Sequence, residues 1–305
     1  MAVRKVEQEL ELMGVLRDAA PEEALAGLRK ALKDPVNMMA AKAAHIAAER
    51  HLRQLLPDLL HTFDRLFGDA VRRDPQCWGK NAIAKALITL GHTEAAPYLR
   101  GLRHIQMEPV WGGAADTAGS LRGACVLGLA ACTDIRREDA LRAMVDAVAD
   151  AGEPVRLEVV RGIAQMGGDE GSLLLRMKAR IGDEAPAVTG QVFDCILALE
   201  GDGGVDFVKT FLKRGALEAR EEAALSLGTS HIPAAVPVLM EAFEGEKEIR
   251  EALLRALSLS RQEQAFEFLL NLVRDGRMAD AKAAEEALAI HPEMQQRVDM
   301  AKAER

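Results

Sequence analysis

The residues that most often do chemistry in proteins, histidine and cysteine, are few in this chain and lie far apart. The sequence has seven histidines, and each is followed by isoleucine, leucine, threonine or proline. A metal site needs several ligands brought to one point, and no cysteine–histidine cluster is present. We therefore expect no metal, and we interpret most histidines as helix-end or surface residues.

The four cysteines, Cys77, Cys125, Cys132 and Cys195, include no CxxC pair. Cys125 and Cys132 are seven residues apart, which places them on one face of a helix, with Arg122 one turn from Cys125. A reactive thiolate needs a histidine or a cation that lowers its pKa, but the surrounding alanine, valine and leucine favour a core position. We expect four buried or half-buried thiols in a reducing compartment and no catalytic cysteine.

Glycine pairs at 112–113, 167–168 and 203–204 could belong to phosphate-binding loops. Such loops follow a strand and open a helix, whereas these pairs follow helical segments. We interpret them as helix caps and turns. The sequence therefore predicts no cofactor and no catalytic residue, and it favours a protein that is not an enzyme.

Composition indicates a helical fold with an uneven charge. Hydrophobic residues make up 49% of the chain, aromatic residues only 4% and charged residues 28%. Alanine, leucine, glutamate and arginine dominate, and these residues favour helices over sheets. Residues 1–152 hold 20 basic and 20 acidic side chains, which leaves 19 of the 39 basic and 27 of the 47 acidic residues for the remainder. The net charge of −8 therefore lies in the second half and repels polyanions, which disfavours nucleic acid as a partner.

The N-terminal segment is charged throughout and lacks the apolar core of a secretory signal. No run approaches the ~18 apolar residues that a membrane span needs. We expect a cytoplasmic protein without a membrane partner.

Residues 74–102 form a unit that recurs along the chain: a proline-started helix over 78–90, a stop at Gly91 and a second helix over 93–102. An apolar residue three positions before the end of the unit falls at Leu87, Leu129, Ile163, Ile196, Ala224, Leu257 and Leu288. The steps are 42, 34, 33, 28, 33 and 31 residues. Repeats near this length, each a helix pair, are the signature of an α-solenoid, in which each pair packs on its neighbours.

The predicted helix pairs divide the chain into three parts. An amphipathic helix over 3–18 caps the start (residues 1–20), a single repeat array covers 21–291, and residues 292–305 form a polar tail. The expected pairs are 21–32 with 34–51, 54–67 with 75–90, 94–102 with 120–132, 138–150 with 153–168, 172–181 with 184–201, 204–215 with 216–228, 232–245 with 246–260, and 263–276 with 278–291.

Several segments resemble HEAT repeats of the short bacterial type, called phycobilisome-lyase-like. The proline before the leucines of the first helix occurs at Pro57, Pro97 and Pro237. The second helix of the family begins with an acid, often proline, and Val-Arg, as in residues 153–156, and ends in Leu-Gly, as at 90–91. The resemblance covers about residues 20–291. We therefore predict an all-α fold, an α-solenoid of about eight HEAT-like antiparallel helix pairs in a right-handed superhelix.

The resemblance also implies a binding surface. In HEAT units the second helices line a concave face, and the family's arginine site, occupied here by Lys80, Arg122 and Arg156, more often braces the adjacent turn than binds a ligand. The outward positions that we expect to bind are Asn81, Lys85, Arg161, Gln165, Asp194, Glu222 and Arg255, with Ser226 on the same face. This face is basic to neutral in the first half and acidic in the second.

Residues 105–119 are the one stretch without helical period, and they contain Trp111. Insertions in repeat proteins often form the binding face, and exposed tryptophans anchor partners. Trp111 either anchors a partner or folds back between repeats, and both alternatives stay open. Trp78, at the start of a second helix, is expected to be packed.

We therefore predict a non-enzymatic scaffold that binds another protein or a peptide along its concave face. Two alternatives come from the same repeat class. One is a tetrapyrrole (phycobilin) lyase-like pigment binder, which the scarcity of tyrosine and tryptophan disfavours. The other is a HEAT-like DNA glycosylase, which would need a basic, aromatic-lined groove. Iron-binding HEAT-like hydroxylases use His-Glu dipeptides, and this sequence has none.

Overall fold

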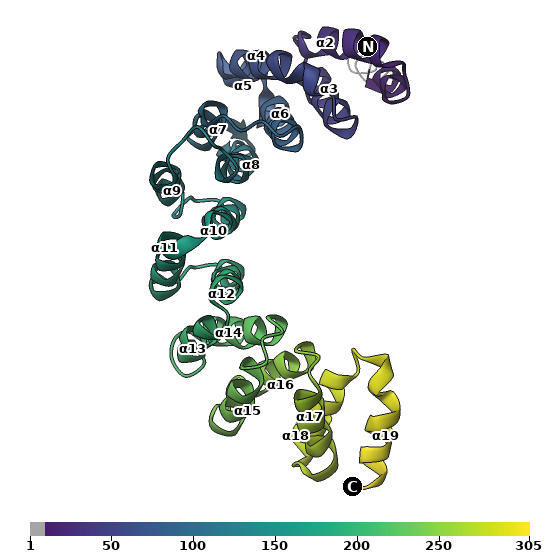
Figure 1. Cartoon of the computed structure of the whole chain (residues 1–305), viewed down its shortest axis with the longest axis vertical. Helices are drawn as coiled ribbons and strands as arrows, with labels where there is room; N and C mark the ends of the chain where they lie inside the picture. Colours follow the sequence, from purple (N-terminus) through teal and green to yellow (C-terminus); the bar gives the residue numbers. More distant parts are fainter. Residues whose placement is uncertain (1–9) are drawn as a thin grey trace. The chain divides into compact units, whose positions relative to one another are not determined.

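The computed structural model of the chain describes residues 10–305. Helices follow one another in antiparallel pairs, and they gather into two compact units, one ending at Met166 and one beginning at Gly167. Each unit is a stack of helix pairs, and Figure 1 labels the helices of both. The all-α repeat fold predicted from the sequence is confirmed. The prediction that residues 21–291 form a single domain stays a prediction.

The first unit holds four helix pairs. They are α2 (Pro21–Leu32) with α3 (Asn37–Glu49), α4 (Leu56–Phe67) and the short α5 (Ala70–Arg73) with α6 (Trp78–Thr89), α7 (Ala95–Leu102) with α8 (Gly119–Ala130), and α9 (Arg137–Asp146) with α10 (Glu153–Met166). Short 3-10 turns occur at η1 (Gly14–Arg17), η2 (Arg53–Leu55) and η3 (Pro75–Cys77). The helix expected over residues 3–18 falls partly on residues 1–9, which lie outside the described part; residues 10–13 are helical.

The second unit holds the other four pairs and a C-terminal helix. They are α11 (Gly168–Ile181) with α12 (Pro186–Glu200), α13 (Asp202–Val208) and η4 (Lys209–Phe211) with α14 (Leu217–Thr229), α15 (Ala235–Gly245) with α16 (Arg250–Leu259), and α17 (Glu263–Asp275) with α18 (Met278–Leu288), followed by η5 (Pro292–Met294) and α19 (Gln295–Ala303). Every expected pair is present, with ends that differ by a few residues.

The second helices of successive pairs pack side by side. In the first unit α3, α6, α8 and α10 form one layer, and in the second unit α12, α14, α16 and α18 do the same (Figure 1). Small residues let these helices approach closely. A Cβ on Gly162 would lie 2.3 Å from Val126, and one on Gly228 would lie 2.2 Å from the Ala256 carbonyl oxygen. The alanine-rich sequence therefore specifies close helix packing, with each pair buried against its neighbours.

Buried cations join the two helices of a pair, as expected for the family's arginine site. Lys80 is fully buried, and its Nζ donates to the Leu66 carbonyl at 3.3 Å. Arg122 Nη1 donates to the His104 carbonyl at 3.0 Å, and Arg156 Nη1 to the Asp150 carbonyl at 2.8 Å. The second unit repeats this contact with Arg220 on Leu212 and Arg250 on Phe243. The prediction that these positions brace the adjacent turn is confirmed.

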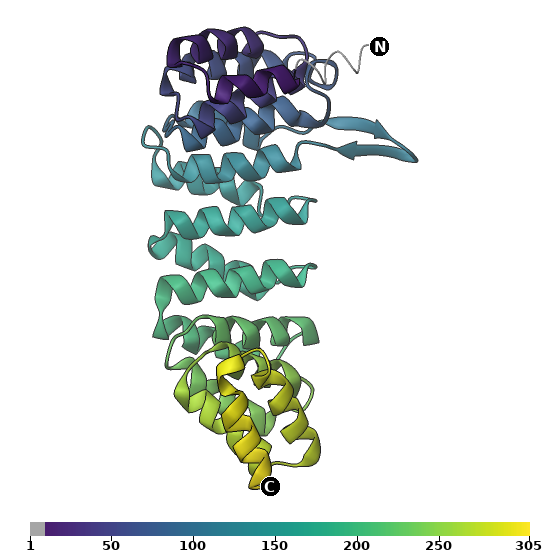
Figure 2. The same cartoon turned by 90° about the vertical axis from the view of Figure 1, so that its right-hand side faces the viewer.

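The non-helical insertion forms a β-hairpin. Strand β1 (Met107–Val110) pairs antiparallel with β2 (Gly113–Asp116), and Pro109 lies opposite Ala114. The turn falls at 111–112, where Gly112 has a φ of +89°, a conformation that glycine adopts without steric cost. The hairpin projects away from the helices of the first unit (Figure 2). Residues 107–116 show no alternating apolar pattern because most of the hairpin faces solvent.

No helix within residues 10–305 combines the length and the apolar character needed to cross a bilayer.

Two adjacent glycines of α13 offer a test of the helix packing. A Cβ on Gly204 would lie 2.9 Å from the Ile196 carbonyl oxygen and 3.0 Å from Leu197 Cα, so Gly204→Ala must push the backbones apart. A Cβ on Gly203 would meet nothing within 4 Å. We expect Gly204→Ala to lower the free energy of unfolding by about 1–3 kcal/mol and Gly203→Ala to raise it by a few tenths. Urea unfolding followed by circular dichroism checks this, and equal effects of the two changes would contradict the packing described.

Candidate functional site: an anchored hairpin beside an open helix layer

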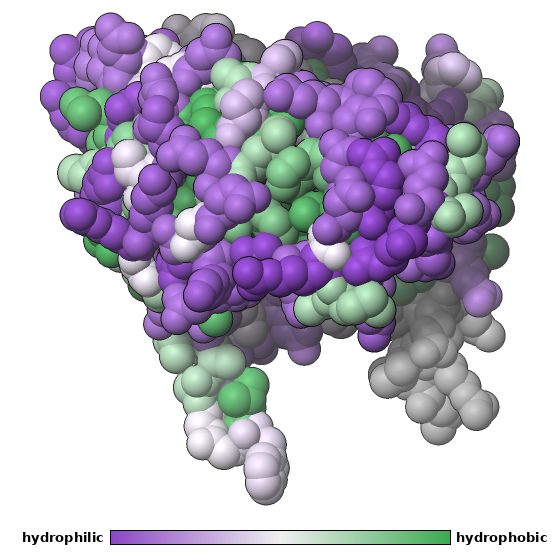
Figure 3. Space-filling model, turned by 90° about the horizontal axis from the view of Figure 1, so that it is seen from below, coloured by the Kyte–Doolittle hydropathy of each residue, from purple (hydrophilic) through white to green (hydrophobic). Residues whose placement is uncertain are grey.

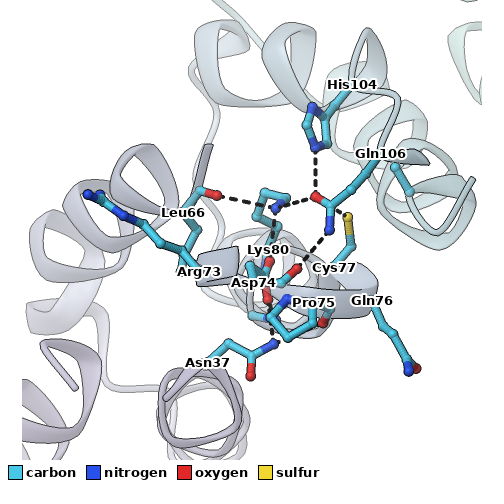
Figure 4. A network of polar contacts seen from close by, with 12 residues as sticks. Asn37, Leu66, Arg73, Asp74, Pro75, Gln76, Cys77, Lys80, His104 and Gln106 are labelled. Carbon is cyan, nitrogen blue, oxygen red and sulfur yellow. Dashed lines mark hydrogen bonds and ion pairs between the residues drawn. The ribbon is translucent and has the colours of Figure 1, made fainter. Parts of the chain in front are cut away.

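A buried ion pair lies at the centre of the first unit. Lys80 Nζ and Asp74 Oδ2 are 3.1 Å apart, and both side chains are fully buried. The Asp74 carboxylate also accepts the amides of Gly79 at 2.7 Å and Lys80 at 2.9 Å, and thereby caps α6. Asn37 donates to the same carboxylate at 2.8 Å from α3 (Figure 4). Each charge is thus fully hydrogen-bonded, as a buried pair requires.

Gln106 connects this ion pair to the hairpin. Its Oε1 accepts from Lys80 Nζ at 2.9 Å and Cys77 Sγ at 3.2 Å, and it contacts His104 Nε2 at 3.1 Å (Figure 4). Its Nε2 donates to the Asp74 carbonyl at 2.8 Å and to Glu108 at 2.6 Å. One amide side chain therefore joins α6, the turn before it and strand β1.

Two carboxylates hold the base of the hairpin. Glu108 Oε1 accepts from the Gln76 amide at 2.6 Å and from Thr117 Oγ1 at 2.7 Å. Burial by itself raises the pKa of the Glu108 carboxyl, but the hydrogen bonds from Thr117, Gln106 and Gln76 outweigh it and hold the pKa below its usual value. Asp116 Oδ1 accepts a hydrogen bond from the backbone N–H of Gln106 at 2.9 Å. The hairpin is therefore fixed at its base by charged hydrogen bonds.

The rest of the hairpin is uncharged and exposed. Trp111 is fully exposed, and Ile105, Met107 and Val110 are 66%, 54% and 49% exposed. Between Glu108 and Asp116 the sequence contains no charged residue. Figure 3 shows the hairpin standing out from the surface in apolar and neutral colours. Of the two alternatives for Trp111, packing between repeats does not occur.

The exposed layer of the first unit carries a groove of about 360 Å³ between α3 and α6. Met38 and Trp78 form apolar parts of its wall, and Lys42 and Lys85 lie along it. Asn81 also lines the groove, and its Oδ1 is buried without a hydrogen-bond partner among the described residues. The groove therefore combines apolar surface, positive charge and an unused acceptor.

A second hollow, of about 500 Å³, continues the same layer over α6, α8 and α10. Lys85 of α6 and Glu158 of α10 both line it. The hollow therefore connects a predicted binding residue of α6 with α10. Arg161 Nη1 donates to Glu158 Oε1 at 2.9 Å, and Gln165 is exposed one turn further on. The structure thus places Asn81, Lys85 and Arg161 on one layer.

The remaining predicted residues belong to the second unit. Asp194 lines a hollow of about 640 Å³ over α12 and α14, and Arg255 lines another of about 350 Å³ over α16 and α18. Burial raises the pKa of the Asp194 carboxyl and of Glu222, and the Asp194 charge raises the pKa of Glu222 further. Ser226 lines the same hollow as Asp194, as expected for this face, but it is buried and donates to the Gly190 carbonyl at 3.3 Å.

Trp78 is more exposed than the sequence predicted. It is 47% exposed, because α6 begins one residue after the left-handed Cys77, which turns the first helical position toward solvent. Sequence reasoning missed Met38 and Lys42 as well, since α3 shows no family motif. It missed the roles of Gln106 and Glu108 because their partners lie about 30 residues earlier in the chain.

No disulfide joins the four cysteines, and burial raises the pKa values of Cys77, Cys125 and Cys132. The pKa of Cys77 is raised to about 11 and that of Cys132 to about 12, in each case chiefly by burial. Cys125 is fully buried, and its pKa is raised for the same reason. Such thiols are poor nucleophiles at neutral pH. Within residues 10–305 no three His, Cys, Asp or Glu side chains gather as a possible metal site.

The paired helices, the layer of second helices and the bracing cations define a helical-repeat protein. The segment 219–245, which covers most of α14 and all of α15, matches the family model described as the PBS lyase HEAT-like repeat. This segment therefore resembles a HEAT-like repeat, as the motifs of the sequence indicated.

Solved structures of helical proteins resemble the chain distantly. Human deoxyhypusine hydroxylase in complex with glycerol is 18% identical, with 85% of this chain and 91% of that chain covered and a TM-score of 0.32. An engineered protein, target OR497 of a structural genomics consortium, is 15% identical, with 93% and 84% covered and a TM-score of 0.37. No curated protein matches the sequence.

The buried ion pair should dominate the stability of the first unit. Lys80→Met leaves the Asp74 carboxylate buried without its cation, and we expect a loss of about 3–5 kcal/mol in the free energy of unfolding. Lys85→Met, on the exposed side of the same helix, should change it by less than about 0.5 kcal/mol. Urea unfolding of both variants checks this. Similar losses for the two would mean that the ion pair contributes little.

The hairpin base should respond to acid. Since the folded pKa of Glu108 lies below its usual value of 4.5, its anchoring is fully present above that pH and is lost as the pH falls through the folded pKa. We expect the fluorescence anisotropy of Trp111, in a Trp78→Phe background, to fall on acidification. Glu108→Gln keeps the shape and removes the charge, so the acid response should shrink to the part that Asp116, whose pKa is also lowered, contributes. An unchanged acid response in Glu108→Gln would contradict the assignment.

Proposed function

We propose that this protein is a binding module for another protein, with the hairpin and the groove between α3 and α6 as its contact surface. The observation that carries the proposal is the fully exposed Trp111 on a hairpin whose base is held by the buried Glu108. Because exposed apolar side chains are costly to keep in water, a hairpin that is built to project them is best explained by a partner that covers them.

The hairpin suits an anchor for three physical reasons. Tryptophan is among the residues that contribute most to protein interfaces. The fixed base reduces the conformational entropy that binding must otherwise remove. The hairpin has two strands only, so each strand keeps an edge with backbone groups that a partner strand can pair.

The groove adjoins the hairpin base. Cys77, which immediately precedes Trp78, donates to Gln106 at 3.2 Å, so groove and hairpin share the N-terminal end of α6. Lys42 and Lys85 have no carboxylate partner among the described residues, and the unused Asn81 Oδ1 can accept a backbone N–H. The groove therefore favours a peptide segment that carries an apolar side chain next to carboxylates.

Affinity capture with matched variants tests the proposal. The immobilised wild type, Trp111→Ala and Lys85→Glu are compared for proteins retained from the native lysate by quantitative mass spectrometry. Leu173→Ala, which removes an exposed leucine of α11, is the control. We expect a partner whose retention falls about tenfold or more with Trp111→Ala, as for an interface anchor, falls with Lys85→Glu, and is unchanged by Leu173→Ala.

Three results would contradict this function. One is a partner retained equally by all four proteins. Another is an absorbing pigment that co-purifies and leaves with Lys85→Glu. The third is retained nucleic acid, which should be released by moderate salt.

A further inference from the structure

A separate pocket of about 670 Å³ lies in the second unit, where the end of α11 faces the segment between η4 and α14. Its volume is in the range of small-molecule sites. Arg180, Lys213 and Arg214 line it, together with the hydroxyl-bearing Thr189 and Thr210. It belongs to none of the surfaces described above.

The pocket carries charge of the opposite sign to the net charge of its unit. Residues 167–305 hold 17 of the 39 basic and 25 of the 47 acidic side chains, yet three cations gather here. The single carboxylate of the lining, Asp183, is neutralised by Lys178 at 2.8 Å, and both of these side chains are largely buried. The pocket is therefore locally positive within an acidic unit.

Arg180 is held in place without an anionic partner. Arg176 and Arg180, one turn apart on α11, both stack on the Phe207 ring, with guanidinium-to-centroid distances of 4.5 and 4.6 Å. Arg176 also pairs with Glu200, its Nε lying 2.9 Å from Oε1. Arg180 instead stacks on Phe211 at 4.7 Å and has no carboxylate among residues 10–305. Stacking orients a guanidinium and leaves its N–H donors free for an anion.

The other cations are similarly available. Arg214 has no carboxylate partner in the described part of the chain. Lys213 lies 3.5 Å from Glu241, and both side chains are more than half exposed, so this pair is weak. The three cations of the lining exceed the charge of its single carboxylate, Asp183, which Lys178 already neutralises.

Backbone groups add to the positive potential. Helix α14 begins after Ala216 without a side-chain cap, so its first amides have no acceptor within the helix and its dipole presents its positive end. Ala216 and Ala219 line the pocket. Gly182 and Gly215 have positive φ, and a Cβ on either would meet nothing within 4 Å, which leaves the backbone open to a ligand.

We infer that this pocket binds a phosphate monoester. A dianionic tetrahedral group matches several cations and a helix N-terminus, and the volume leaves room for an organic group beside Phe211. The source is either a free phosphorylated small molecule or a phosphorylated side chain of another protein. The inference is independent of the hairpin and of the protein partner proposed above.

Calorimetric titration of the full chain in low-salt, phosphate-free buffer tests it. The probes are inorganic phosphate, glycerol phosphate, a phosphoserine peptide and the same peptide without phosphate. We expect both esters to bind, and the tighter ester identifies the source. Arg180→Gln and Arg214→Gln should each weaken binding about tenfold or more, whereas Arg277→Gln, an exposed arginine outside the pocket, and Trp111→Ala should not.

The inference is overturned if neither ester binds, if inorganic phosphate alone binds, or if the peptide binds equally without its phosphate. Loss of binding in Arg277→Gln to the same degree as in Arg180→Gln would indicate non-specific charge attraction and also overturn it. Arg214 is exposed and makes no ion pair with a described residue, so Arg214→Gln keeps the fold intact and remains informative if Arg180→Gln unfolds.

Discussion

The last backbone carbonyls of the first helix in each repeat have no N–H donor within that helix. The fold depends on the hydrogen bonds that these carbonyls accept from elsewhere. A cation from the second helix donates to them: Lys80 to Leu66, Arg122 to the carbonyl just after α7, and Arg250 to Phe243. The positive charge also stabilises the negative end of the helix dipole. Because donor and acceptor belong to different helices, the contact sets how the two helices of a pair lie against each other.

A buried or partly buried cation needs a counter-charge, and the carboxylates come from the loop after α9 and from the first turn of α18. Asp150 pairs with Arg122 at 2.7 Å, and Asp280 pairs with Arg250 at 3.1 Å. Asp280 belongs to the following pair of helices, so this bond also connects neighbouring repeats. The bracing contact thus extends from one helix pair to the next, and the polar core supports the stack together with the apolar one.

The second repeat extends this contact to a new element. Lys80 donates to Gln106 as well as to Leu66, and Gln106 connects it to the base of the hairpin. The residues that hold the fold together therefore also hold Trp111 away from it. A single repeat can in this way carry a projecting element without loss of packing, since the added bonds satisfy groups that are already buried.

The sequence by itself determined the repeat architecture, the helix pairs and the bracing role of Lys80, Arg122 and Arg156. The architecture and the helix pairs follow from local periodicity and from proline and glycine positions, and the bracing role follows from the resemblance to HEAT repeats. Only the tertiary structure decided that residues 107–116 form a hairpin, that Trp78 is exposed, and that Arg180 has aromatic neighbours but no carboxylate partner among residues 10–305. Exposure and charge pairing depend on residues that are distant along the chain, and helical periodicity carries no information about which of them meet.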